Sequence, residues 1–225
     1  MTFSAVIFDL DGTLIDSIRD IGEAMNRTLE ALGYPVHDLT KYPYLIGDGV
    51  RLLVQRALPP DAQTDDKINA FLVLYRKDYG QNWRIHTHPY PGIKGLLNHL
   101  VSLSIPIGVL SNKPDRVTIK CVEYFFPDIP FVAVSGQKDD VPRKPDPTAA
   151  LEIAEAMNVK PSLCVFVGDT STDMQTAVAA GMFPAGVTWG FRDRQELLEH
   201  GARFLAYTPN ALLGLFQDKA SVVEA

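Results

Sequence analysis

Five short apolar runs, each followed by a polar turn and then a helical pattern, constrain the fold of this chain more than any other feature. The runs span residues 5–8, 106–110, 131–134, 163–167 and 184–187. They are nearly continuous instead of alternating, which is typical of strands buried on both faces of a parallel sheet. Helical patterns lie between or beside them at 93–103, 116–125, 147–157 and 172–180. We therefore predict an α/β fold built on a doubly wound parallel sheet.

One long stretch breaks this alternation. Between residues 17 and 90 no run has strand character, whereas 18–32, 50–58 and 68–79 carry the periodicity of amphipathic helices. We predict an all-α cap subdomain at 17–90, inserted into a core formed by 1–16 and 91–216, with a frayed tail at 217–225. The alternative is that these helices simply pad the α/β core.

The composition excludes several functional classes. With 225 residues, 46% of them hydrophobic, the chain is too apolar to be disordered and long enough for a sizeable core. It carries 21 Lys and Arg against 27 Asp and Glu, a net charge of −6, which argues against nucleic acid or an anionic membrane as a partner. No run approaches the roughly 18 apolar residues of a spanning helix. We expect a cytoplasmic protein, monomeric or homodimeric, with Cys121 and Cys164 as buried thiols.

Polar side chains follow three of the predicted strands. They are Asp9 and Asp11 after the first run, Ser111, Asn112 and Lys113 after the second, and Asp169 and Asp173 after the run at 163–167. The carboxyl ends of parallel strands meet at one edge of a sheet, so these side chains are expected to form one site. Lys144, in a proline-rich loop, is a candidate to join them.

The chemistry of this set indicates a metal and a phosphate. Asp9 and Asp11 are two residues apart and face the same way in an extended chain. Held close to Asp169 they would repel one another and take up protons unless a cation is bound, and ligands that are all oxygen favour Mg²⁺. Hydroxyl groups beside the expected helix N-termini, at Thr13, Ser111 and Thr170, and the ammonium groups of Lys113 and Lys144 suit phosphate oxygens. A carboxylate in such a pocket is also placed to attack phosphorus.

Taken together in this order, these motifs resemble those of the haloacid dehalogenase-like hydrolase superfamily. The four are Asp9-x-Asp11-Gly12-Thr13, Ser111-Asn112-Lys113, Lys144 and Gly168-Asp169-x-x-x-Asp173. The resemblance implies a Rossmann-like core, Asp9 as the nucleophile that forms an aspartyl-phosphate, and Asp11 as the acid and then the base. It also implies that Ser111 and Lys144 hold the phosphoryl group. Mg²⁺ would be bound by Asp9, the backbone carbonyl of Asp11 and Asp169, with Asp173 bound directly or through water.

Further short motifs resemble those of the phosphoglycolate phosphatase-like subgroup. They are Gly47-Asp48-Gly49, Tyr90-Pro91-Gly92 and Trp189-Gly190-Phe191, besides the helical insertion itself. Asp11 is the position at which dehalogenases of the superfamily lack an acid, so the resemblance implies a member that handles phosphate. The substrate-binding residues expected are Thr13, Asn112, Lys113, Gly49 and Arg51. Arg51 could bind a substrate carboxylate bidentately, or it could be an ordinary surface arginine.

The function predicted from the sequence is Mg²⁺-dependent hydrolysis of a small anionic phosphomonoester, with phosphoglycolate as the first substrate. A phosphosugar mutase similar to β-phosphoglucomutase shares the same chemistry and returns the phosphoryl group to a sugar. A receiver-type signalling domain also uses an Asp cluster, Mg²⁺, a hydroxyl residue and a Lys. Receivers are about half this length and carry the nucleophile on a central strand, so this third alternative fits least.

Overall fold

The computed structural model describes residues 2–217 and is centred on a six-stranded sheet in the order β5-β4-β1-β6-β7-β8. All neighbouring strands of this sheet pair in parallel. The strands are β1 (Ala5–Phe8), β4 (Ile107–Pro114), β5 (Ala133–Gln137), β6 (Cys164–Gly168), β7 (Phe183–Val187) and β8 (Phe204–Ala206). The α/β class and the doubly wound parallel sheet are therefore confirmed.

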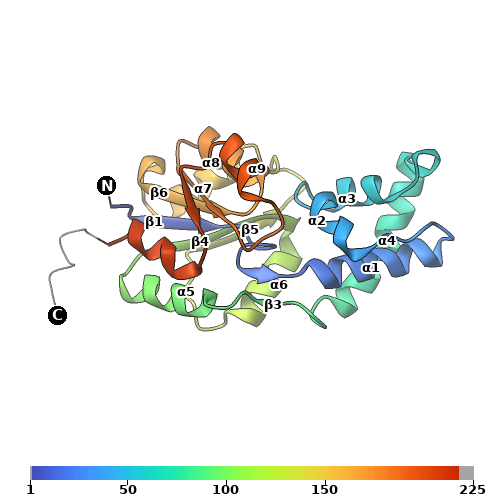
Figure 1. The fold of residues 1–225 in the computed structure, drawn as a ribbon, viewed down its shortest axis with the longest axis horizontal. Helices are drawn as coiled ribbons and strands as arrows, with labels where there is room; N and C mark the ends of the chain where they lie inside the picture. The colour runs from blue at the N-terminus through green and yellow to red at the C-terminus, as the bar shows by residue number, and fades with distance from the viewer. Residues whose placement is uncertain (1, 218–225) are drawn as a thin grey trace.

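Helices cover both faces of this sheet (Figure 1). Helices α5 (Ile93–Ser102) and α6 (Asp115–Phe125) lie on one face, and α7 (Thr148–Ala156), α8 (Ser171–Ala179) and α9 (Arg194–Glu199) lie on the other. Alternate residues of β1 point to the helices on opposite faces of the sheet, because successive side chains of a strand point in opposite directions. Val6 and Phe8 pack into the hydrophobic cluster of α5 and α6, whereas Ala5 and Ile7 pack into that of α7 and α8.

Two elements of the core are not predicted from the sequence. The strand β8 and the six-residue helix α9 are too short to show a clear period. In addition, β4 continues to Pro114 instead of ending at residue 110, with a register shift against β5 between Leu110 and Pro114. The polar residues expected to follow this strand therefore belong to its irregular end.

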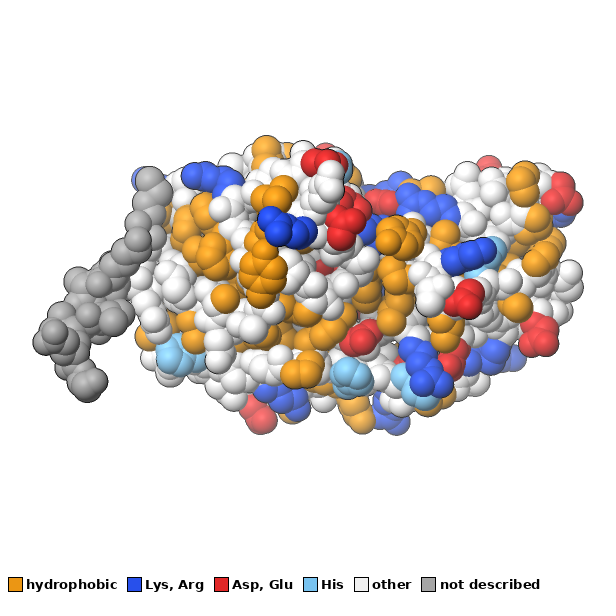
Figure 2. Space-filling view, in the orientation of Figure 1, with side chains coloured by type: hydrophobic (Ala, Val, Ile, Leu, Met, Phe, Trp, Pro, Cys, Tyr) orange, Lys and Arg blue, Asp and Glu red, His pale blue; other side chains and the backbone are white. Residues whose placement is uncertain are grey.

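The stretch between residues 17 and 90 is helical. It contains α1 (Ile18–Ala31), α2 (Tyr42–Leu45), α3 (Val50–Ala57) and α4 (Asp65–Asn82), which lie together on the right of Figure 1. Helices α1 and α4 are joined by Arg27 and Asp78, whose Nη2 and Oδ1 atoms are 2.6 Å apart. We call residues 17–90 the cap and the remainder the core, and the outline of the molecule narrows where they meet (Figure 2).

A short ribbon connects the cap to the core. Strands β2 (Ile15–Asp16) and β3 (His88–Pro89) pair antiparallel at the two ends of the helical stretch. The sequence predicts no strand at 88–89, because a pair of residues carries no periodicity. The 3₁₀ helices are η1 (Leu39–Lys41), η2 (Pro60–Ala62), η3 (Pro161–Leu163) and η4 (Pro209–Leu215). Of these, η4 lies at the end of the core opposite the cap (Figure 1).

Three further sequence expectations concern the tail, membrane-spanning helices and the two cysteines. The frayed tail predicted at 217–225 lies, apart from Gln217, outside the described residues. Within 2–217, no helix combines the length and the apolar character needed to cross a membrane. Both cysteines are buried free thiols, and burial raises the pKa of each to about 11.

Candidate active site

The polar motifs converge where three adjacent strands, β4, β1 and β6, reach the same edge of the sheet. Asp9 follows β1, Asp169 follows β6, and Ser111 lies in the irregular end of β4. Asp9 and Ser111 line a cavity of about 770 Å³ between the core and the cap. The topology thus brings together residues that are more than a hundred positions apart in the sequence.

Three buried carboxylates form the floor of the site. Asp9, Asp169 and Asp173 each have an oxygen atom within 4.8 Å of the others. Two hydrogen bonds orient Asp169: the Thr13 hydroxyl donates to Oδ1 at 3.0 Å and the Phe191 amide donates to Oδ2 at 2.8 Å. Burial raises the pKa of Asp9 to about 7, with Lys144 opposing this rise and Asp173 adding to it. Burial and the charge of Asp173 likewise hold the pKa of Asp169 well above its usual value.

This donor set fits a hard divalent cation. Carboxylate oxygens gathered in a buried place are the ligands that such ions select, and a bound cation offsets the burial and the mutual repulsion that raise the pKa values of Asp9 and Asp169. Neighbouring backbone also approaches closely: a Cβ atom at Gly12 or Gly190 would collide with the Asp169 carboxylate. The side chain of Asp11 is not part of the cluster, so only its backbone carbonyl remains available in the way the resemblance implies.

Lys144 neutralises part of the carboxylate cluster. Its Nζ atom is 2.8 Å from Asp9 Oδ1 and 2.6 Å from Asp173 Oδ1. Burial lowers the pKa of this ammonium, but the charges of Asp173 and Asp9 outweigh burial and raise it. The other oxygen of Asp173 accepts hydrogen bonds from the amide and hydroxyl of Thr170 at the start of α8. Asp173 therefore ties Lys144 to the end of a helix.

Asn112 holds the Lys144 loop in place. Its Oδ1 accepts a hydrogen bond from the Lys144 amide at 3.0 Å, and its Nδ2 donates to the Lys144 carbonyl at 3.1 Å. The same Nδ2 atom donates to the carbonyl of Gly47 in the cap. The sequence predicts Asn112 to bind substrate; in the structure it lines the cavity, but its amide is occupied by these backbone groups.

Lys113 pairs with Asp11, and not with the carboxylate cluster of Asp9, Asp169 and Asp173. Its Nζ atom is 2.8 and 3.0 Å from the two Asp11 oxygens and 2.8 Å from the hydroxyl of Tyr79, a cap residue on α4. The Ser17 hydroxyl also donates to Asp11, at 2.5 Å. Burial lowers the pKa of Lys113, but the charge of Asp11 outweighs it, and the pKa lies well above its usual value.

The other predicted substrate-binding residues separate into two groups. Gly49 lines the cavity at the start of α3 with a φ of 87°, a conformation that favours glycine. Thr13 is fully buried and turned to Asp169, and Arg51 pairs with Asp65 and donates to Asn69, so neither lines the cavity. Arg51 follows the cavity-lining Val50 by one residue, which places it about 100° further round the helix.

Three contacts that join one cap loop to the core are not predictable from the sequence. The Asn112 Nδ2 atom is 3.0 Å from the Gly47 carbonyl, the Thr172 hydroxyl is 3.0 Å from Asp48 Oδ1, and Arg192 Nη2 is 2.9 Å from the Ile46 carbonyl. We call these contacts the cap tethers. Pairings between segments this distant follow no local pattern, so only the folded structure reveals them.

A second acidic group lies at the hinge of the cap. Asp20, Glu23 and His86 bring ligand-type atoms within 4.8 Å of one another. Both oxygens of buried Asp20 already have donors: they accept from the amides of His86 and Thr87 and from the Thr87 hydroxyl. This arrangement explains the buried Asp20 as an anchor for the returning chain.

Comparison with known proteins agrees with the motifs and the fold. A family model described as haloacid dehalogenase-like hydrolase matches residues 3–181. A phosphoglycolate phosphatase of Pseudomonas putida strain KT2440 is 32% identical over 92% of this chain and 75% of its own length. The phosphoglycolate phosphatase of Aquifex aeolicus is 34% identical over 83% of this chain and 85% of its own length.

Solved structures extend this similarity to the whole fold. A proposed phosphoglycolate phosphatase from Lactobacillus delbrueckii subsp. bulgaricus superposes with a TM-score of 0.91 at 30% identity, covering 97% of this chain and 100% of that one. A haloacid dehalogenase-like family hydrolase from Streptococcus pneumoniae gives a TM-score of 0.86 at 26% identity, covering 96% and 99%. The chain therefore belongs to the haloacid dehalogenase-like hydrolases, in the part of that family that resembles the phosphoglycolate phosphatases.

Proposed function

We propose that this protein hydrolyses phosphomonoesters of small anionic metabolites through a phosphorylated Asp9. The observation that carries the proposal is the position of Asp9: a buried carboxylate at the floor of the cavity, beside two further carboxylates and 2.8 Å from Lys144. The names of the relatives support a phosphatase and make phosphoglycolate the reference substrate. Neither nucleic acid nor a membrane is part of the proposal.

The first half-reaction transfers the phosphoryl group to the protein. An Asp9 oxygen attacks phosphorus while the bond between phosphorus and the ester oxygen breaks, and Asp11 gives its proton to the departing alcohol. Lys144 and the hydroxyl of Ser111 hold the phosphoryl oxygens and offset their charge. Such positioning and charge stabilisation are the main demands that phosphoryl transfer makes on a protein.

The second half-reaction restores the protein. Asp11 takes a proton from water, the water oxygen attacks phosphorus, and the bond to Asp9 breaks to release inorganic phosphate. Lys113 and Ser17, which both donate to the Asp11 carboxylate, hold it in place between the two proton transfers.

Magnesium is the proposed cofactor. Asp9, Asp169, Asp173 and the backbone carbonyl of Asp11 would hold it. When bound, it supplies positive charge that neutralises the carboxylates and polarises the phosphoryl group. The contacts of Lys144 with Asp9 and Asp173 leave the second oxygen of Asp9 for this purpose.

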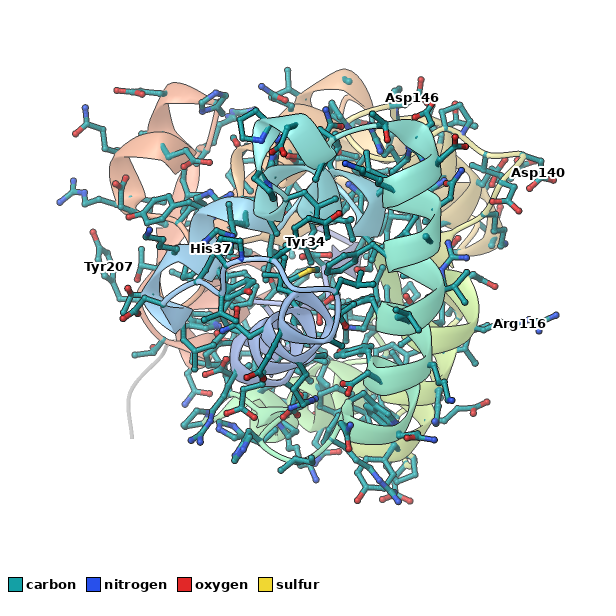
Figure 3. The ribbon with its side chains drawn as sticks, turned by 90° about the vertical axis from the view of Figure 1, so that its right-hand side faces the viewer. Tyr34, His37, Arg116, Asp140, Asp146 and Tyr207 are labelled. Atoms are coloured by element: carbon teal, nitrogen blue, oxygen red, sulfur yellow. The ribbon has the colours of Figure 1, made fainter. Side chains whose placement is uncertain are left out.

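The test is phosphate release from a panel of glycolate, sugar and nucleotide monophosphates, with Mg²⁺ and with EDTA. We expect turnover only with Mg²⁺, and its loss in Asp9→Asn, because an amide is a poor nucleophile. Asp140→Asn is the matched control, since Asp140 lies on an exposed loop and points away from the body of the protein (Figure 3). Undiminished turnover by Asp9→Asn would refute the covalent scheme. Isomerised phosphosugar with little free phosphate would indicate a mutase.

A further inference from the structure

The cavity next to Asp9 is larger than a two-carbon substrate requires. Its volume of about 770 Å³ lies within the range of about 300–1,000 Å³ that is typical of sites for drug-sized ligands. Phosphoglycolate has only two carbons beyond its phosphoryl group. Most of the cavity would therefore stay filled with water if phosphoglycolate were the substrate for which it is shaped.

This volume is not the result of a cap that stands away from the core. The three cap tethers already join the loop of Ile46, Gly47 and Asp48 to core residues at distances of 2.9–3.0 Å. On the other flank, the Tyr79 hydroxyl is 2.8 Å from Lys113 Nζ. The cavity is thus the space that remains while the cap contacts the core on both sides.

The cap side of this cavity is mainly apolar and aromatic, and the exposed Arg76 is the one charged residue among the described cap residues that line it. Ile21, Val50 and Leu53 line it, together with Tyr75 and Tyr79. The two tyrosine rings lie one turn apart on α4 and stack with centroids 5.6 Å apart and an angle of 6° between their planes. Burial of apolar substrate surface against such a wall is favourable, whereas burial of a hydrated carboxylate against it is not.

Among the described residues that line the cavity, the two buried cations already have carboxylate partners. Among the described lining residues, Lys144 is engaged by Asp9 and Asp173, and Lys113 by Asp11 and Tyr79. Arg51, expected from the sequence to read this carboxylate, is paired with Asp65 outside the cavity. The other basic residues that line the cavity, Arg76, Arg116 and Lys138, are exposed, and Arg116 extends outward (Figure 3). A carboxylate buried beside the phosphoryl group would therefore have to compete with Asp9, Asp11 or Asp173 for these two ammonium groups.

We propose that the preferred substrates are phosphomonoesters whose alcohol part carries an apolar or aromatic body larger than glycolate, which packs against Leu53, Val50 and the stacked Tyr75 and Tyr79. This inference rests on the proposed function and narrows its substrate class. Leu53 and Val50 are then specificity-determining residues, because they contact the part of the substrate that differs between esters.

The test compares esters with similar leaving groups and different bodies. Ethyl phosphate and 2-phenylethyl phosphate are both esters of primary alkyl alcohols, so their kcat/KM ratio reports the body and not the leaving group. With Mg²⁺ we expect 2-phenylethyl phosphate to exceed both ethyl phosphate and phosphoglycolate by about tenfold or more in kcat/KM. Equal values for the two alkyl esters, or a tenfold preference for phosphoglycolate, would overturn the inference and leave the phosphatase proposal standing. No release from any ester would overturn both.

Variants of α3 test whether its side chains cause the preference for the larger ester. Leu53→Asn should lower the ratio of 2-phenylethyl to ethyl phosphate about tenfold, because it replaces an apolar contact by an amide. Leu52→Asn is the control on the same helix, since Leu52 does not line the cavity, and its ratio should equal that of the wild type. If Leu53→Asn fails to fold, as judged by circular dichroism, Val50→Thr gives the same test with nearly unchanged shape. A ratio unchanged in the variant that folds would refute the role of this wall.

Discussion

Removing the buried charge of Lys144 should destabilise this structure strongly. Lys144 is buried, and its ammonium group contacts two of three carboxylates that lie within 4.8 Å of one another. Replacing it by methionine keeps much of the volume and removes the charge. Asp9, Asp169 and Asp173 would then face one another without a cation when Mg²⁺ is withheld.

The size of the effect follows from this burial. Removing one partner of a buried ion pair costs about 3–5 kcal/mol, because the remaining charge has lost both water and its counter-ion. For a protein of this length that loss corresponds to a fall of about 10 °C in Tm. We expect Lys144→Met, unfolded by urea in EDTA at pH 8 and followed by circular dichroism, to show a loss of this order.

The effect should depend on pH in a defined direction. Burial raises the pKa of Asp9 from 3.8 to about 7, so between about pH 4 and pH 7 the folded protein binds a proton that the unfolded chain releases. Stability therefore rises as the pH falls through this window. Lys144 lowers the pKa of Asp9, so the variant should hold this proton to a higher pH. The loss caused by Lys144→Met should be greatest above pH 7 and smaller at pH 5, where Asp9 is protonated in both proteins.

Lys160→Met is the matched control. Lys160 is exposed and forms no ion pair within the described residues, so its replacement should change stability by less than about 0.5 kcal/mol. A loss below about 1 kcal/mol in Lys144→Met, or a loss that is the same at pH 5 and pH 8, would refute the reasoning from buried charge.

Two further predictions concern the cap and the thiols. Asp78→Asn should destabilise the protein by at most about 1 kcal/mol, because the pair with Arg27 is partly exposed. The hydrogen bond from Arg27 lowers the pKa of Asp78, so the stabilisation by this pair is present above the usual carboxyl pKa and is lost as the pH falls below it. Urea unfolding at pH 7 and at pH 3 checks this dependence. Cys121 and Cys164 should react with Ellman's reagent at pH 8 far more slowly in the native protein than in urea, because burial raises the pKa of both thiols to about 11; rapid native labelling of both would contradict their burial.

The elements predicted best are those with long or strongly patterned segments. The run at 163–167 becomes β6, and the amphipathic pattern at 18–32 becomes α1 with nearly the same bounds. Both signals are local, since burial on one or two faces leaves its period in the sequence. The three-residue β8 and the six-residue α9 leave too few positions for a period to show, and the sheet decides where they form.

Some features of the candidate site are likewise predictable from the sequence and others are not. The sequence alone indicated an Asp cluster with Lys144, because polar residues at the ends of parallel strands must meet wherever those strands are adjacent. It could not show that Thr13 serves Asp169, or that Arg51 turns to Asp65, because the direction of a side chain depends on the packing of its own helix or turn.

Local residue patterns therefore specify the class of fold, the family motifs and the chemistry gathered at the edge of the sheet. The surroundings of that chemistry depend on long-range packing: Asn112 holds the Lys144 loop, Tyr79 contacts Lys113 from the cap, and an apolar wall faces Asp9. The two kinds of information differ because the contacting residues are far apart along the chain. Strand and helix periods are written within a few residues, whereas a hydrogen bond between Lys113 and Tyr79 or between Thr172 and Asp48 exists only after the cap and the core have packed together.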